Sequence, residues 1–326
     1  MTDADAGSTP SFDLQVNGFG GVDFNRDGLT GDELHTACAR LEADGVAGIL
    51  ATIITDDVDL MCGRLAALAA LRARDPIAAR LIAGIHIEGP FLNEADGYRG
   101  AHPAGAIRAA SVETMSRLLD AAAGTTRIVT LAPERDPGFA VTRMLAARGV
   151  VVSAGHCDPT IDQLRGAIDA GLTMFTHLGN GCPMHLHRHD NIVQRVLSVA
   201  ESLWICFIAD GTHVPFVALG NYLRIVGLDR GIVVTDSIAA AGLGPGRYTL
   251  GRQDVVVDKD LVAWGPDRSH FVGSAISMAE SRRRLRHALQ LSDSAIDQLT
   301  WHNPRRAAFG PPGAVGAPGP VGAPGL

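Results

Sequence analysis

The chain has 326 residues, of which 46% are hydrophobic and 19% charged, and its formal net charge is −7. This length and apolar content exclude a disordered chain and are enough to bury one large core or two modest ones. The negative charge gives no electrostatic reason to expect nucleic acid or a membrane surface as a partner, so neither is expected.

The cysteines and the N-terminus bear on the compartment of the protein. The 5 cysteines are scattered without a Cys-x-x-Cys pair, which favours reduced thiols over disulfides. The segment Met1–Asp5 is acidic and lacks the cationic start and apolar run of a signal peptide. No apolar stretch approaches the roughly 20 residues that span a membrane. We therefore expect a cytoplasmic protein.

Short β-branched runs alternate along the chain with segments rich in alanine and leucine, a pattern typical of alternating β and α units. Strands are predicted at Phe12–Val16, Ala47–Ile54, Leu81–Ile87, Arg127–Leu131, Val150–Ser153, Thr173–Thr176, Leu203–Ala209 and Ile232–Thr235. Helices are predicted between them at Gly31–Asp44, Val58–Arg74, Val112–Ala123, Phe139–Ala147, Thr160–Ala170 and Val214–Val226. The pattern predicts an α/β fold, a (β/α)8 TIM-like barrel, with an open doubly wound sheet as the alternative.

Two stretches interrupt the alternation and suggest a domain organisation. An alternating apolar pattern within residues 247–271 predicts a β-hairpin inserted after the eighth strand. From Gly310 to Leu326, glycine occupies every third position, but the repeat is too short for a stable triple helix, so a disordered tail is expected. We therefore predict an N-terminal lead over residues 1–11, a barrel over 12–309 and a tail over 310–326.

Polar residues follow most of the predicted strands, at the end of the barrel where active sites are built. A single histidine in such a place is most often a packing residue, so the joint pattern carries the prediction. Glu88, His156 and His177 supply the carboxylate and two imidazoles that a catalytic zinc uses, with one coordination position left for water. Asp236 is expected to act on that water as general base, and His213 to polarise a substrate carbonyl.

Taken in order, these motifs resemble those of the N-acetylglucosamine-6-phosphate deacetylases, a family of the amidohydrolase superfamily. The resemblance implies that Glu88, His156 and His177 bind the metal, that Asp236 is the catalytic base and later acid, and that His213 contacts the substrate acetamide. It extends from about residue 12 to about residue 309, through Asp13–Gly18, Gly84–Leu92, Ser153–His156, Thr176–Asn180, Ala209–His213, Val234–Asp236 and Asn303–Pro304.

The resemblance also implies a site for a sugar phosphate. It puts His102 near the phosphate, Asn180 and the backbone of Gly181 in a phosphate-binding turn, and Arg188 on the phosphate of a neighbouring subunit, so a homodimer is expected. The stretch His185–Asp190 suggests a second metal site at first sight. We interpret it instead as a substrate-side loop, because alternating histidines in a loop need not converge and a guanidinium binds phosphate in bidentate fashion.

The first strand indicates how many metals the site holds. Gln15 and Asn17 occupy the places where many amidohydrolases have a His-x-His pair, and amides are poor zinc ligands. The only lysine, Lys259, lies in the predicted hairpin, so no carbamylated lysine at a strand end can bridge two metals. We expect one divalent metal per subunit, with zinc first and Fe2+, Co2+ and Mn2+ as alternatives.

The expected reaction is metal-dependent hydrolysis of the N-acetyl group of N-acetylglucosamine-6-phosphate, a small-molecule substrate of amino-sugar metabolism. Relatives commonly carry a small β-sandwich formed by segments before and after the barrel, and most of that sandwich is expected to be missing here. Two other hypotheses stay open. One is a deacetylase of another N-acylated amino sugar or small amine without a phosphate requirement, and the other is a catalytically silent barrel used for binding.

Overall fold

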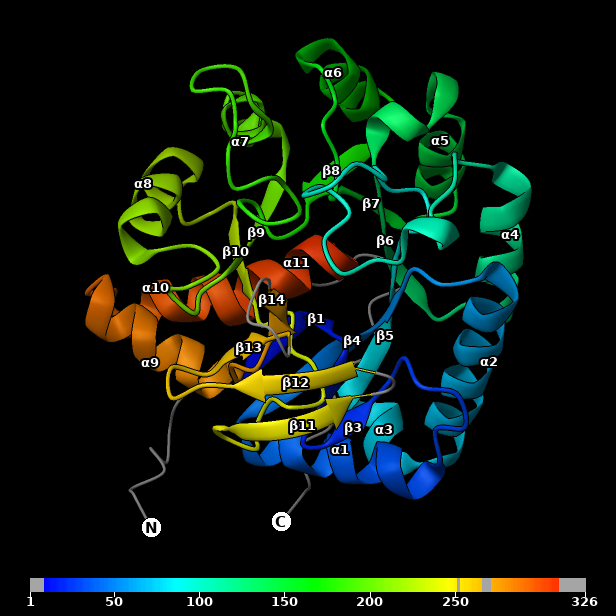
Figure 1. Ribbon diagram of the computed structural model, residues 1–326, viewed down its shortest axis with the longest axis vertical. Coiled ribbons are helices and arrows are strands. Elements are labelled where there is room, and N and C mark those ends of the chain that lie inside the picture. Colours follow the sequence, from blue (N-terminus) through cyan, green and yellow to red (C-terminus); the bar gives the residue numbers. More distant parts are fainter. Residues whose placement is uncertain (1–8, 251–252, 266–270, 311–326) are drawn as a thin grey trace.

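The computed structural model describes residues 9–250, 253–265 and 271–310. Eight parallel strands form one sheet that curls into a barrel surrounded by helices (Figure 1). The predicted (β/α)8 barrel is therefore confirmed, and the open doubly wound alternative is wrong. In sheet order the strands are β1 (Ser11–Val16), β4 (Val46–Ile54), β5 (Ile82–Glu88), β6 (Thr126–Leu131), β7 (Val151–Ala154), β8 (Leu172–Phe175), β9 (Trp204–Ile208) and β10 (Gly231–Val234).

The helices begin where capping side chains satisfy their first N–H groups. Thr30 and Thr160 form capping boxes with Glu33 and Gln163, in which each threonine hydroxyl accepts a backbone N–H and each longer side chain accepts one in return. Every predicted helix overlaps an observed one. The α-helices are α1 (Gly31–Ala43), α2 (Val58–Arg74), α3 (Pro76–Leu81), α4 (Val112–Ala121), α5 (Ala140–Ala147), α6 (Ile161–Asp169), α7 (Ile192–Leu197), α8 (Phe216–Val226), α9 (Met278–Ala288), α10 (Asp293–Asp297) and α11 (Asn303–Phe309).

Apolar side chains fill one end of the barrel. Helix α11 covers this end, and the ring of Phe309 meets that of Phe12 edge to face with 5.7 Å between centroids. Phe12 lies near the start of β1, so the opposite end of the barrel is left for polar side chains, as in other barrels of this kind. The buried cluster inside the barrel contains Phe12, Leu14, Leu50, Ile128, Met174, Cys206, Ile208, Ile232 and Val234.

A second, smaller sheet follows β10 along the chain. It has four antiparallel strands, where the sequence predicted a hairpin within residues 247–271. This sheet is joined to the barrel where Ser274 pairs with Ser237, directly after β10, a contact between distant residues that local periodicity does not reveal. Its strands are β11 (Gly246–Leu250), β12 (Gln253–Val257), β13 (Val262–Trp264) and β14 (Phe271–Ser274), and a separate short pair is β2 (Gly18–Phe19) with β3 (Val22–Asp23).

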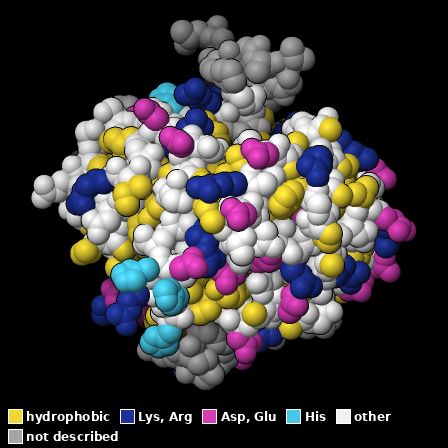
Figure 2. Space-filling view, turned by 90° about the horizontal axis from the view of Figure 1, so that it is seen from above, with side chains coloured by type: hydrophobic (Ala, Val, Ile, Leu, Met, Phe, Trp, Pro, Cys, Tyr) yellow, Lys and Arg dark blue, Asp and Glu magenta, His cyan; other side chains and the backbone are white. Residues whose placement is uncertain are grey.

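The predicted chain ends fall largely outside the described residues. Most of the lead over 1–11, and all of the tail over 310–326 except Gly310, lie there, so these boundaries stay predictions. On the face seen in Figure 2, acidic and basic side chains are interspersed. In the described part of the chain, no helix combines the length and the apolar character needed to traverse a bilayer.

Candidate active site

Three side chains from three strand ends meet at the polar end of the barrel. Glu88 is the last residue of β5, while His156 and His177 follow β7 and β8 by two residues each. All three are buried, and the Nε2 atoms of His156 and His177 lie 3.3 and 3.1 Å from Glu88 Oε1. Their potential ligand atoms are within 4.8 Å of one another.

The chemistry of this cluster fits a divalent metal. His156 Nδ1 lies 2.8 Å from the Tyr98 carbonyl, an acceptor, so this contact orients the ring with Nε2 toward Glu88. Burial opposes ionisation of Glu88, but its contacts with His156 and His177 hold the pKa well below its usual range. A buried carboxylate and two facing imidazole nitrogens need either protons or a cation between them. One carboxylate and two imidazoles are also a ligand set that catalytic zinc uses.

The backbone at these strand ends is strained. His156, His177 and Asp236 have φ values of 51°, 34° and 50°, in the left-handed region that residues other than glycine rarely occupy. Strain of this kind costs about 1–3 kcal/mol per residue and is concentrated at functional sites. The three strand ends therefore share a left-handed backbone conformation that the packing of helices and strands does not by itself require.

The two amides of the first strand support the carboxylates. Gln15 Nε2 donates to both oxygens of Glu88, at 3.2 and 3.1 Å. Asn17 Nδ2 donates to Asp236 Oδ1 at 2.8 Å. Gln15 and Asn17 thus donate hydrogen bonds to acidic groups of the site.

Asp236 and His213 lie on neighbouring strand ends. Burial and then the charge of Glu88 raise the pKa of Asp236 to about 6, close to the value that suits a general base near neutral pH. His213 Nδ1 lies 2.5 Å from Asp210 Oδ2, so the imidazole is fixed in orientation by a buried carboxylate. Despite its burial, the contact with His213 holds the pKa of Asp210 below its usual value. Sequence analysis gave Asp210 no role, although it begins the same motif that contains His213.

Comparison with known proteins shows which family the chain belongs to. No protein-family model matches the chain. Over 306 residues, however, the chain is 34% identical to the human N-acetylglucosamine-6-phosphate deacetylase, and the match covers 90% of this chain and 72% of the human protein. The chain belongs to the N-acetylglucosamine-6-phosphate deacetylase family. The predicted family resemblance is confirmed.

Other relatives support the family and widen the range of sugars. The chain is 29% identical to the N-acetylgalactosamine-6-phosphate deacetylase of Escherichia coli over 273 residues, or 84% of this chain and 70% of that protein. Among solved structures, a mutant of the Mycobacterium smegmatis N-acetyl-D-glucosamine-6-phosphate deacetylase, in complex with N-acetyl-D-glucosamine-6-phosphate, is similar with a TM-score of 0.83. That match has 31% identity and covers 92% of this chain and 77% of the other.

His102 lies beside the metal cluster. Its Nε2 is 3.3 Å from His156 Nε2, and the two rings meet edge to face with 4.4 Å between centroids. Burial lowers the pKa of His102 to about 3, so its ring is neutral. The family resemblance implies a place for His102 near the sugar phosphate; in the structure its ring lies against that of His156, a member of the metal cluster.

The turn after β8 also packs on a member of the cluster. Gly181 has φ of 60°, and a Cβ atom added there would lie 2.9 Å from His156 Nδ1. The neighbouring Asn180 donates its side-chain N–H to the His177 carbonyl at 3.2 Å. This turn therefore supports two members of the metal cluster, in addition to the phosphate contact that the resemblance implies for it.

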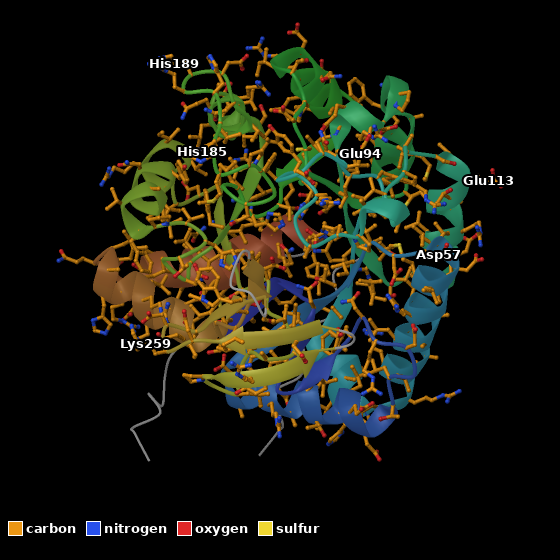
Figure 3. The ribbon with its side chains drawn as sticks, viewed as in Figure 1. Asp57, Glu94, Glu113, His185, His189 and Lys259 are labelled. Carbon is orange, nitrogen blue, oxygen red and sulfur yellow. The ribbon has the colours of Figure 1, made fainter. Side chains whose placement is uncertain are left out.

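The loop that carries Arg188 projects from the barrel. Figure 3 shows His185 and His189 on this loop, with His189 at the periphery of the molecule. Within the described residues, the one group of three or more side chains suited to hold a metal is the Glu88 cluster, so the histidines of this loop do not form a second such group. Arg188 is exposed, which leaves its guanidinium accessible from outside the subunit.

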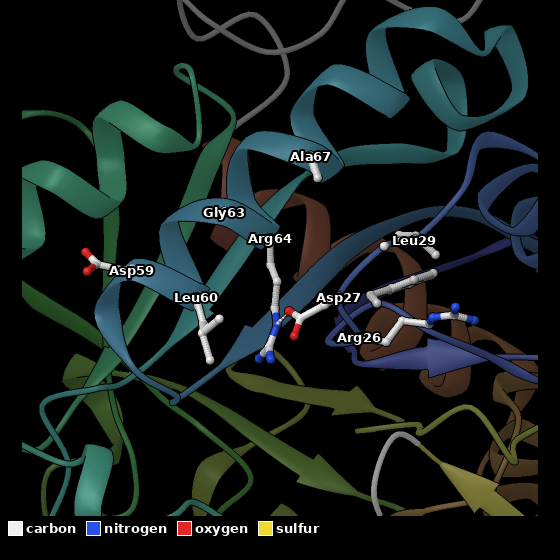
Figure 4. Close-up of a pocket in the computed structure, with 10 residues that line it drawn as sticks. Arg26, Asp27, Leu29, Asp59, Leu60, Gly63, Arg64 and Ala67 are labelled. Atoms are coloured by element: carbon white, nitrogen blue, oxygen red, sulfur yellow. Dashed lines mark hydrogen bonds and ion pairs between the residues drawn. The ribbon is translucent and has the colours of Figure 1, made fainter.

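A cavity of about 230 Å³ lies away from this site, between α2 and the residues after β3 (Figure 4). Arg64, one of its lining residues, forms ion pairs with Asp27 at 2.9 Å and Asp56 at 2.8 Å. The cavity contains no member of the metal cluster. Its charged lining thus has partners of its own, and the cavity takes no part in the site described above.

Proposed function

We propose that the protein is a metal-dependent hydrolase that converts N-acetylglucosamine-6-phosphate to glucosamine-6-phosphate and acetate. The observation that carries the proposal is the buried Glu88, His156 and His177 cluster with Asp236 and His213 on adjacent strand ends, in a chain of this family. Such an arrangement gives no support to a silent barrel used only for binding.

Glu88, His156 and His177 would hold the metal, and we propose zinc, with Fe2+, Co2+ and Mn2+ as alternatives. When bound, a divalent metal polarises the acetamide carbonyl and the attacking water. One metal per subunit follows from the donor set, because Gln15 and Asn17 contribute amide donors that point to carboxylates.

The chain's own residues account for the proton movements. Asp236, oriented by Asn17, takes a proton from the water that attacks the acetamide carbon. As the C–N bond breaks, Asp236 gives this proton to the nitrogen of the leaving amine, and acetate is released. His213, oriented by Asp210, and the neutral His102 are placed to hold the acetamide and the charge that develops on its oxygen.

For the sugar phosphate we propose Asn180 and the Gly181 backbone, with Arg188 contributed by the second subunit of a homodimer. The exposed position of Arg188 on a projecting loop is compatible with service to a neighbouring subunit. The alternative function is a deacetylase of another N-acylated amino sugar or small amine without a phosphate requirement. The position of His102 beside His156 favours this alternative, because it removes one expected contact from the phosphate.

Acetate release by the metal-analysed protein tests the proposal. The substrates are N-acetylglucosamine-6-phosphate, N-acetylgalactosamine-6-phosphate and unphosphorylated N-acetylglucosamine. We expect the first to be preferred. Equal turnover of the first and the third would replace the proposal by the alternative. No turnover of any of them with about one metal per chain would refute the proposal and leave another N-acylated substrate as the alternative. The proposed homodimer is tested by measuring the size of the wild type and of an Arg188→Ala variant in solution. The KM of both proteins for the phosphorylated substrates tests the contact between Arg188 and the phosphate.

A further inference from the structure

The barrel closes at a seam between its first and last strands. The eight-stranded sheet ends at β1 and β10. Just after these strands, the N–H groups of Asn17 and Gly18 donate to the Ser237 carbonyl at 2.8 and 3.2 Å. Gln15 and Asn17 lie on one side of this seam and Asp236 lies on the other. The geometry of the site therefore depends on how the two edges are held together.

Asp13 spans this seam inside the barrel. Its carboxylate is buried and accepts the backbone N–H of Gln15 at 3.1 Å on its own strand. Across the seam it accepts the Thr235 N–H at 3.2 Å and the Thr235 hydroxyl at 2.5 Å. The same hydroxyl oxygen accepts the Ser237 N–H at 3.2 Å. One carboxylate thus holds Gln15 itself and the residue that precedes Asp236.

Gln15 and Thr235, the two residues that Asp13 connects, each adjoin a residue of the active site. On the β1 side, Gln15 donates through its side chain to both oxygens of Glu88. On the β10 side, Asp236 follows Thr235 directly and keeps a strained φ of 50°. A shift of Thr235 therefore changes the direction of the Asp236 side chain, and a shift of the Gln15 backbone changes its contact with Glu88.

An apolar pair of residues would close the seam without burying a charged group close to Asp236. A buried carboxylate is unfavourable unless its hydrogen bonds are made, and here four donor contacts from two strands surround it. Such contacts have a direction, which apolar packing lacks. The arrangement favours a role in orientation over a role in core packing.

We propose that Asp13 is a positioning residue for the deacetylation, holding the ends of β1 and β10 so that Gln15 stays on Glu88 and Asp236 stays on Asn17. This inference rests on the proposed function, because the reaction that Asp236 serves is the one given there. The hydrogen bonds described for Asp13 go to Gln15 and Thr235, and none of them reaches Glu88, His156 or His177.

Substitutions on both sides of the link test the proposal. Thr235→Val removes the hydroxyl and keeps the shape, and Asp13→Asn keeps the size and replaces one acceptor oxygen by an N–H donor. We expect each to lower kcat by about tenfold or more while KM and bound metal stay near wild type, since misplacing a supporting group commonly changes activity by about 10–100-fold. Thr235→Ser keeps the hydroxyl and should restore most of kcat.

A second buried Asp–Thr pair provides the control. Asp136 accepts the Thr142 hydroxyl at 2.8 Å and the Thr142 N–H at 2.8 Å at the start of α5, away from the seam. Asp136→Asn and Thr142→Val should lower thermal stability without the fall in kcat. If Thr235→Val keeps wild-type kcat, or if kcat falls equally in the Thr142→Val variant of matched stability, Asp13 has no positioning role.

A structural readout separates this inference from the proposed function. Crystal structures of the metal-loaded wild type and Thr235→Val show directly whether the hydrogen bond from Asn17 to Asp236 survives. Loss of that bond in the variant supports the inference even if the wild type releases no acetate from any amino sugar. An unchanged bond, with Asp236 in its wild-type position, overturns it.

Discussion

Replacing Gly181 with alanine should weaken metal binding without unfolding the barrel. At φ of 60°, the alanine Cβ would lie 2.9 Å from His156 Nδ1, 3.1 Å from Cγ and 3.2 Å from Cα. These atoms belong to a metal-cluster residue whose Nδ1 is already committed to the Tyr98 carbonyl. The imidazole must therefore move, and its Nε2 moves with it.

Two contributions to the effect can be separated. The left-handed backbone costs alanine about 1–2 kcal/mol of folding stability. Displacement of His156 should lower metal affinity by about 10–100-fold, the range for lost support of a ligand. At about 1.4 kcal/mol per factor of ten, this second loss corresponds to about 1.4–2.8 kcal/mol of metal-binding free energy.

Gly138 provides a matched control, because it has φ of 61° and an added Cβ would meet no heavy atom within 4 Å. Gly138→Ala therefore carries the backbone cost alone. The assay is competition of each variant with a chromophoric chelator for Zn2+, together with thermal unfolding of the metal-free proteins. We expect similar losses of metal-free stability but weaker metal binding only in Gly181→Ala. Equal metal affinity in the two variants would refute the reasoning.

Three further predictions concern the carboxylates. The Asp236→Asn variant should keep its metal, but its kcat should fall by about 10²–10⁴-fold because an amide takes up no proton. Metal analysis with steady-state kinetics checks this prediction, and a kcat near that of the wild type would contradict it. Asp210→Asn should lower kcat by about 10–100-fold by releasing the His213 ring, and an unchanged kcat would exclude that support. Burial raises the pKa of Asp13 from 3.8 to about 7, so the stability that its protonated form provides is complete below about pH 4 and is lost as pH rises through about 7. Between about pH 5 and about pH 8, the unfolding free energy of the wild type should fall by on the order of 2 kcal/mol more than that of Asp13→Asn, and parallel urea-unfolding results would contradict this.

The barrel was predictable from the sequence because its signals are local. Runs of β-branched residues and the helical periodicity between them depend on near neighbours, and parallel strands place their C-terminal ends on one side. This is why Glu88, His156 and His177, distant in sequence, were expected together, and the structure brings their ligand atoms within 4.8 Å. Gln15 and Asn17 were likewise expected to be poor metal ligands from the chemistry of amides alone.

The local sequence pattern does not show which residues pair with each other across the barrel. The attachment of the four-stranded sheet to the barrel depends on Ser274 meeting Ser237, and the place of His102 depends on a long loop that folds back onto His156. The roles of Asp210 and Asp13 depend on which donors reach their buried oxygens, and residue type alone does not specify this. The sequence by itself thus determined the element order and the set of reactive groups. Only the tertiary structure decided how those groups are oriented, because orientation depends on hydrogen bonds between strands that are far apart in the chain.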